Sequence, residues 1–215
     1  MTRIILILFL VFFSLFKVQP QYFVDTAKLN QAYRDLERYP RNFDREKAFF
    51  NAFPSSWMEF ILTYQFFPGR LLYLDIEHIN AFGNLSIIPD SSYCDKLIFI
   101  AVGGKWEADA PSAFQKILHK NMDKKTDVFF SQLSKLHRGF QLRFWQFYWS
   151  SMTHPEDNMN YVREDFKREC ELLRNKMKTT HLEEVKTMEI AFLFAFGEIT
   201  FSKIENNFPH NYFVK

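Results

Sequence analysis

The chain has 215 residues, of which 19% are aromatic, while glycine and proline are scarce at 6 and 8 residues. This balance excludes collagen-like, linker-like and intrinsically disordered chains and is enough for one medium-sized domain. Two cysteines exclude a disulfide-dense scaffold, a cysteine-built zinc ribbon and an iron–sulfur site. A formal net charge of +2 lacks the basic excess of a nucleic-acid binder, so we expect no nucleic-acid partner.

The N-terminus has the pattern of an export signal. A short basic stretch ends at Arg3, and Ile4–Phe16 follows as 13 residues of which all but one are apolar. This run has the length of a signal-peptide core and falls short of the roughly 20 residues of a membrane span. We therefore expect residues 1–20 to be a signal peptide and the remainder to reach the periplasm or the exterior. An uncleaved anchor helix is the alternative.

Helical periodicity runs through almost all of the remaining chain and predicts an all-α, single compact domain of roughly seven to nine helices over residues 21–215. In the first half, one helix is expected from a cap at Asp25 to Tyr39 and a second from a cap at Asp44 to Phe53. A third runs from Trp57 towards Pro68, and a fourth contains Leu72, Ile76 and Ile79 and ends at Gly83. A fifth runs from Asp109 to about Asn121. Lys96–Val102 is compatible with a strand, but no neighbouring segment offers a partner strand, so we favour a buried helix.

The second half predicts three longer helices. Asp127–Ser150 shows aromatic and leucine residues at steps of three and four, which indicates one long helix. Asp157–Lys178 is amphipathic, and a last helix is expected over His181–Ile204. The centre of that last helix, Ile190–Phe196, is apolar on all sides and too short to span a bilayer. We therefore expect it to be the core helix.

The sequence carries no recognised catalytic motif. Its glycine pair, Gly103-Gly104, lies in no nucleotide-binding pattern, and neither G-x-S-x-G nor H-E-x-x-H occurs. Asp75 with His78, and His181 with Glu184, share helix faces, but a helical di-metal site needs two Glu-x-x-His motifs and two further glutamates. We therefore assign no catalytic residue, no metal and no cofactor, and consider catalysis the less favoured interpretation.

Three glutamates lie among apolar residues, namely Glu59, Glu189 and Glu198. Burial would raise the pKa of such a carboxyl group, as happens at some catalytic sites. Glu189 and Glu198 are nine residues apart and point to opposite sides of one helix, so they cannot pair with each other. A catalytic carboxylate is one interpretation; hydrogen bonds that order the core are the one we favour.

Cys170 lies on the apolar stripe of its helix, which is typical of a small core residue, and Cys94 lies near a helix start. An exported protein could also join the two in a disulfide, and both possibilities stay open. Asn84-Leu85-Ser86 is a glycosylation sequon, which has meaning only in a eukaryotic secretory host.

The most distinctive segment is Gly103–Gln115, where Lys105 and Trp106 precede a helix that Asp109 is placed to cap. It is either a binding corner with free backbone N–H groups or a helix cap with Trp106 packed as a hydrophobic staple. A second group of aromatic residues could form a binding surface, although such residues more often form core: Trp57, Trp145 and Trp149, with Phe53.

Two of these segments carry a resemblance. The pattern F-N-A-F-P at Phe50–Pro54, followed by G-K-W-E-A-D-A and F-Q within Gly104–Gln115 and an aromatic helix, resembles a group of uncharacterised exported helical proteins of Gram-negative bacteria. The resemblance covers roughly residues 45–155 and its motifs look structural, so it implies no catalytic residues. Small exported helical proteins of this kind include immunity partners of antibacterial effectors.

Three hypotheses of function follow. The first is an exported, non-catalytic interaction protein with a protein partner, in its most specific form an immunity protein that neutralises an antibacterial effector. The second is an exported hydrolase with a carboxylate site that uses Glu59, Glu189 or Glu198. The third is a binder of a small apolar ligand, held in a pocket lined by phenylalanine and tryptophan.

Overall fold

The described residues of this computed structural model are 25–64, 75–105, 109–150 and 159–197. They form ten helices and no strand, which confirms the all-α prediction for this part of the chain. The helices are α2 (Thr26–Arg38), α3 (Phe43–Ala52), α4 (Trp57–Tyr64), α5 (Asp75–Gly83), α6 (Asp90–Ala101), α7 (Asp109–Lys124), α8 (Thr126–Leu133), α9 (Arg138–Trp149), α10 (Met159–Met177) and α11 (Leu182–Ala195).

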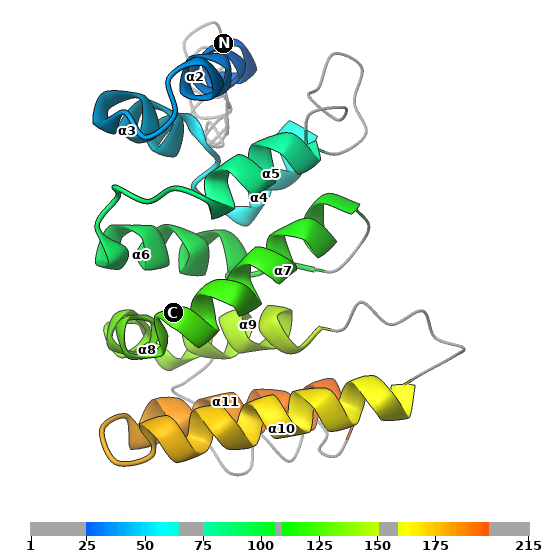
Figure 1. The fold of residues 1–215 in the computed structure, drawn as a ribbon. Coiled ribbons are helices and arrows are strands. Elements are labelled where there is room, and N and C mark those ends of the chain that lie inside the picture. The colour runs from blue at the N-terminus through cyan, green and yellow to red at the C-terminus, as the bar shows by residue number, and fades with distance from the viewer. Residues whose placement is uncertain (1–24, 65–74, 106–108, 151–158, 198–215) are drawn as a thin grey trace, which may run out of the picture.

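The helices follow one another as a stack from α2 and α3 at one end to α10 and α11 at the other (Figure 1). Along the stack, α5 packs on α7, α6 on α8 and α9 on α11, so most contacts join helices two apart in the chain. The helices are short, with 8 to 19 residues each, because turns interrupt the chain between them. The result is a body whose two ends each expose a helix pair.

Local sequence determines most of the helix starts. The side chain of Asp25 accepts a hydrogen bond from the Lys28 backbone N–H over 2.9 Å and caps α2, as predicted. The predicted cap of α3 at Asp44 is wrong, because Asn42 caps this helix and accepts from the Arg45 N–H over 3.1 Å. Asp44 lies instead in the first turn, where its negative charge interacts favourably with the positive end of the helix dipole.

The predicted long helix over Asp127–Ser150 is wrong. It is two helices, α8 and α9, separated at Ser134–His137. The backbone of His137 is extended, with ψ 142°, and its side chain accepts from the Gly139 N–H, which starts α9 anew. The apolar steps continue across this break, so periodicity alone does not reveal it.

The core lies around α9 and α6. In α9, Phe144, Trp145 and Tyr148 are fully buried, and the segment Lys96–Val102 continues α6 as a largely buried helix, as favoured. The expectation that Ile190–Phe196 forms the core helix is wrong. Only one side of that segment is buried, because α11 lies at the end of the stack and packs on α9 and α10.

Residues 1–24, which include the predicted signal peptide, lie outside the described part of the structure. Among the helices that are described, none is both long enough and apolar enough to cross a bilayer.

Candidate functional site

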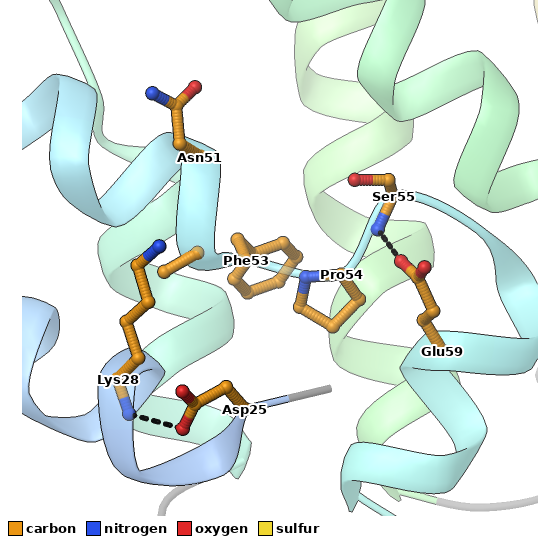
Figure 2. A pocket seen from close by; sticks show the side chains of 8 residues that line it. Asp25, Lys28, Asn51, Phe53, Pro54, Ser55 and Glu59 are labelled. Atoms are coloured by element: carbon orange, nitrogen blue, oxygen red, sulfur yellow. Dashed lines mark hydrogen bonds between the residues drawn. The ribbon is translucent and has the colours of Figure 1, made fainter. Parts of the chain in front are cut away.

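A polar pocket lies at the turn between α3 and α4, within the F-N-A-F-P pattern. Phe53 ends α3 with an extended backbone, and Pro54 lacks the N–H that would continue the helix. The cavity has a volume of about 210 Å³ (Figure 2). It is lined by Asp25, Lys28, Asn51, Ala52, Phe53, Pro54, Ser55 and Glu59.

The carboxylates of this pocket already hold the helix starts. Asp25 caps α2, and Glu59 accepts from the Ser55 backbone N–H over 2.6 Å while the Ser56 hydroxyl accepts from the Glu59 N–H over 3.3 Å. The last two bonds are a reciprocal capping arrangement at α4. The dashed lines of Figure 2 show the Asp25 and Glu59 bonds on opposite sides of Phe53 and Pro54. The pocket therefore offers mixed charges and little apolar lining, unlike the phenylalanine- and tryptophan-lined cavity of the small-ligand hypothesis.

The described glutamates of the hydrolase hypothesis do not meet. Glu59 lies on α4, and Glu189 lies on α11 at the far end of the stack, where it pairs with Arg174 over 3.3 Å (Figure 1). Glu198 lies outside the described residues. Each of the two described carboxylates thus has a separate structural partner.

The second group of aromatic residues is core and not an exposed surface, which corrects the binding assignment of two tryptophans. Trp145 and Trp149 are buried and stack on each other, and the Trp149 indole N–H donates to the carbonyl oxygen of Met188 over 3.3 Å. Trp57 is half-buried and packs on the rings of Phe60 and Phe147. The helical spacing that brought these rings together also turns them inward.

The segment around Gly104 and Gln115 is architectural wherever it is described. A Cβ on Gly104 would lie 2.5 Å from the Phe147 ring, so only glycine allows this close approach. Phe114 is buried, and the Gln115 side chain donates to the carbonyl oxygens of Phe147 and Ser150 over 2.7 Å and 2.6 Å. Of the residues predicted to bind here, Lys105 is exposed, while Trp106 and the Asp109 side chain lie outside the described part.

Sequence reasoning missed a hydrogen-bonded group centred on His119 that joins three helices. In α7, His119 Nδ1 lies 3.0 Å from Glu169 Oε1 of α10, and its Nε2 lies 3.1 Å from the Tyr148 carbonyl oxygen of α9. The Tyr148 hydroxyl donates to the same carboxylate oxygen. Burial and the Glu169 charge hold the pKa of Tyr148 well above its ordinary value, so the phenol remains a donor. The partners are 21 to 50 residues apart in sequence, and no local pattern marks them.

A second histidine is buried among aromatic rings. His78 of α5 packs on Tyr33, Phe49 and Tyr64, and its Nδ1 lies 3.4 Å from the Tyr64 hydroxyl. Burial lowers its pKa to about 4, so the ring is neutral at neutral pH. Its other nitrogen, Nε2, is buried without a hydrogen-bond partner. His78 therefore belongs to the core, at one end of the stack.

Two histidine–carboxylate pairs were predicted to share helix faces. In the second pair, His181 Nδ1 lies 3.6 Å from Glu184 Oε2. In the first pair, the Asp75 side chain lies outside the described part. The described residues contain no group of three histidine, cysteine or carboxylate side chains that could hold a metal ion.

Cys94 and Cys170 are free and buried, so the disulfide alternative is not the arrangement found. Cys94 lies on α6 and Cys170 on α10, and each packs into the core from its own helix. Burial raises the pKa of both thiols to about 12. Both cysteines therefore act as small apolar residues.

Comparisons with protein families, with curated proteins and with solved structures give no match for this chain.

Proposed function

We propose that the chain is an exported protein that binds a protein partner and carries out no catalysis itself. The observation that carries this proposal is the exposure of Tyr39 and Phe43, which are 52% and 50% exposed only four residues apart. Single exposed apolar residues are common, but two exposed aromatic rings on one short connection are typical of partner contacts. These two rings lie where α2 joins α3, at one end of the stack.

The use of the polar side chains supports the same proposal. Glu59 caps a helix, Glu189 pairs with Arg174, and Gln115 and Glu169 connect neighbouring helices. Each of these groups already bonds to another residue of the chain, the Glu189–Arg174 pair at the surface and the others between or at the ends of packed helices. A substrate would have to displace that partner, at the cost of leaving a polar group unpaired.

The specific form that we propose is an immunity protein that neutralises an antibacterial effector outside the cytoplasm. Support for this form comes from the predicted signal peptide and the resemblance to exported helical proteins. A cytotoxic-effector gene directly upstream would fit this role. Co-expression would then test it, because the chain should restore growth to cells that export the effector.

Isolation of the native complex tests the general proposal. The full chain, tagged at its C-terminus, is cross-linked in the cells that naturally produce it and purified under denaturing conditions. We expect one other protein in stoichiometric amount, and we expect the purified pair to associate again without the cross-linker. Recovery of the chain alone, together with a hydrolytic activity that Glu59→Gln or Glu189→Gln abolishes, would overturn the proposal.

A further inference from the structure

The connection between α2 and α3 exposes aromatic rings together with cations. We define the α2–α3 corner as residues 37–47. The Arg45 guanidinium carbon lies 5.9 Å from the centre of the Tyr39 ring, and the Lys47 ammonium lies 5.7 Å from the centre of the Phe43 ring. Both rings therefore present an apolar face with a positive charge beside it.

The charge that the corner presents to solvent is positive. Its exposed cations are Arg38, Arg41, Arg45 and Lys47. Its third carboxylate, Glu46, is buried and turned inward, where it accepts from the Ser86 and Ile87 backbone N–H groups. Only Glu37 and Asp44 remain exposed, and Glu37 accepts from the Tyr33 hydroxyl over 2.7 Å. Arg45 pairs with Asp35 of α2 over 3.0 Å. Arg38, Arg41 and Lys47 remain against Glu37 and Asp44, so the corner has a small outward excess of positive charge, although the whole chain is close to neutral.

The backbone at Arg41 gives a second, independent observation. Its φ is 63°, in the left-handed region that favours glycine or asparagine and is costly for a long side chain. The exposed Arg41 side chain makes no ion pair with any described residue. Arg41 thus has a strained backbone, and its charge is not paired with any described residue of the chain. Strain of this kind is found where a side chain serves function.

From these observations, and resting on the proposed function, we infer that the α2–α3 corner is the docking face. Its occupant is an acidic protein segment that places aspartate or glutamate side chains next to apolar ones. The carboxylates would pair with Arg38 and Arg41, and the apolar side chains would cover Tyr39 and Phe43. Such a pairing of aromatic and arginine contacts is typical of the residues that dominate protein–protein affinity.

Selection from displayed random peptides tests this inference with the full chain as target. The test variant carries Arg41→Gly and Phe43→Ser. Glycine adopts the Arg41 backbone without strain, and Phe43 is half exposed, so this variant should fold. The matched control carries Leu172→Ser and Lys178→Ser, which remove an exposed apolar side chain and an exposed cation from the α10 end of the stack.

We expect the selected peptides to be rich in aspartate, glutamate and apolar residues. The test variant should weaken their binding by about tenfold or more, the control should leave it within about twofold, and added salt should weaken binding to the native chain. Three results would overturn the inference: peptides without acidic residues, peptides that bind the test variant as well as the native chain, or no enriched peptide. Binding to phosphatidylglycerol vesicles alone, lost in the same variant, would assign the corner to a membrane surface instead. The proposed function fails separately, if no native partner is found.

Discussion

The side-chain amide of Gln115 on α7 donates a hydrogen bond to the carbonyl oxygen of Phe147 on α9 over 2.7 Å. The Phe147 carbonyl also accepts from the Ser150 backbone N–H and hydroxyl, and Gln115 donates in addition to the Ser150 carbonyl just beyond the end of α9. A residue from the most distinctive segment of the sequence thus stabilises α9, which carries more buried aromatic rings than any other described helix. The distinctive sequence of Gly103–Gln115 therefore reflects helix packing.

Gln115→Met should lower the free energy of unfolding by about 1 kcal/mol, because it removes the bond to the part-buried Ser150 carbonyl and one of the donors to the buried Phe147 carbonyl. Methionine has nearly the same shape, so little packing is lost. The control is Gln31→Met, since Gln31 is exposed and bonds only to Asp35. Urea unfolding of the two variants measures the difference, and equal losses would contradict the assigned role of Gln115.

Glu46→Gln should also destabilise the chain, by about 2–3 kcal/mol, because the buried Glu46 carboxylate accepts from the Ser86 N–H, the Ser86 hydroxyl and the Ile87 N–H. A glutamine oxygen can still accept from the two backbone N–H groups, but it lacks the charge that strengthens these bonds. Asp44→Asn removes a carboxylate from the exposed side of the same helix and should cost less than about 0.5 kcal/mol. The same urea experiment compares them, and a Glu46→Gln variant as stable as Asp44→Asn would refute the prediction.

His78 should make the chain less stable in mild acid. Its pKa is about 4 in the folded chain and near 6.5 when unfolded, so the unfolded state takes up the proton first as the pH falls. Stability should be unaffected above about pH 6.5, decline between pH 6.5 and 4, and level off below that, with a total loss of up to about 3 kcal/mol.

The His78→Phe variant tests this pH dependence because phenylalanine is aromatic like the surrounding rings and has no proton to exchange. Thermal unfolding at several pH values should show a smaller acid loss in this variant than in the native chain. The control Leu172→Ser changes an exposed side chain and no titratable group, so it should keep the native pH dependence. An unchanged acid loss in His78→Phe would show that other groups cause it.

The two cysteines should resist thiol reagents until the chain unfolds. Both are buried, and burial raises the pKa of both thiols to about 12, so almost no thiolate is present at neutral pH. Reaction with a chromogenic disulfide should therefore be slow in buffer and should reach both thiols in denaturant. Mass spectrometry without reductant would contradict the structure if it showed the two cysteines joined.

The sequence predicted those parts of the fold that depend on neighbouring residues. The Asp25 cap and the Pro54 break each act through residues within a few positions, and α2 and α4 follow from them. The break before α9 was missed because α8 ends at Leu133 and His137 starts α9 without interrupting the apolar spacing. The partial exposure of α11 was also missed, because a helix's place in the stack is a tertiary property.

The candidate sites were harder to predict for the same reason. Glu46 meets Ser86 across 40 residues, and His119 meets Glu169 across 50, so neither contact leaves a local pattern. The strained backbone of Arg41 was equally hidden, because arginine gives no signal for a left-handed conformation. Sequence reasoning placed the binding residues on tryptophans, which are the residues best suited to the core as well as to interfaces.

Amide hydrogen exchange tests the central claim most directly, with the full chain measured alone and in complex with the partner isolated from native cells. If the polar side chains serve architecture and the exposed end of the stack serves binding, the complex should slow exchange in residues 37–47, with no change around Glu59 or Glu189. Slower exchange confined to residues 51–59 around the pocket, with none at the α2–α3 corner, would contradict this account.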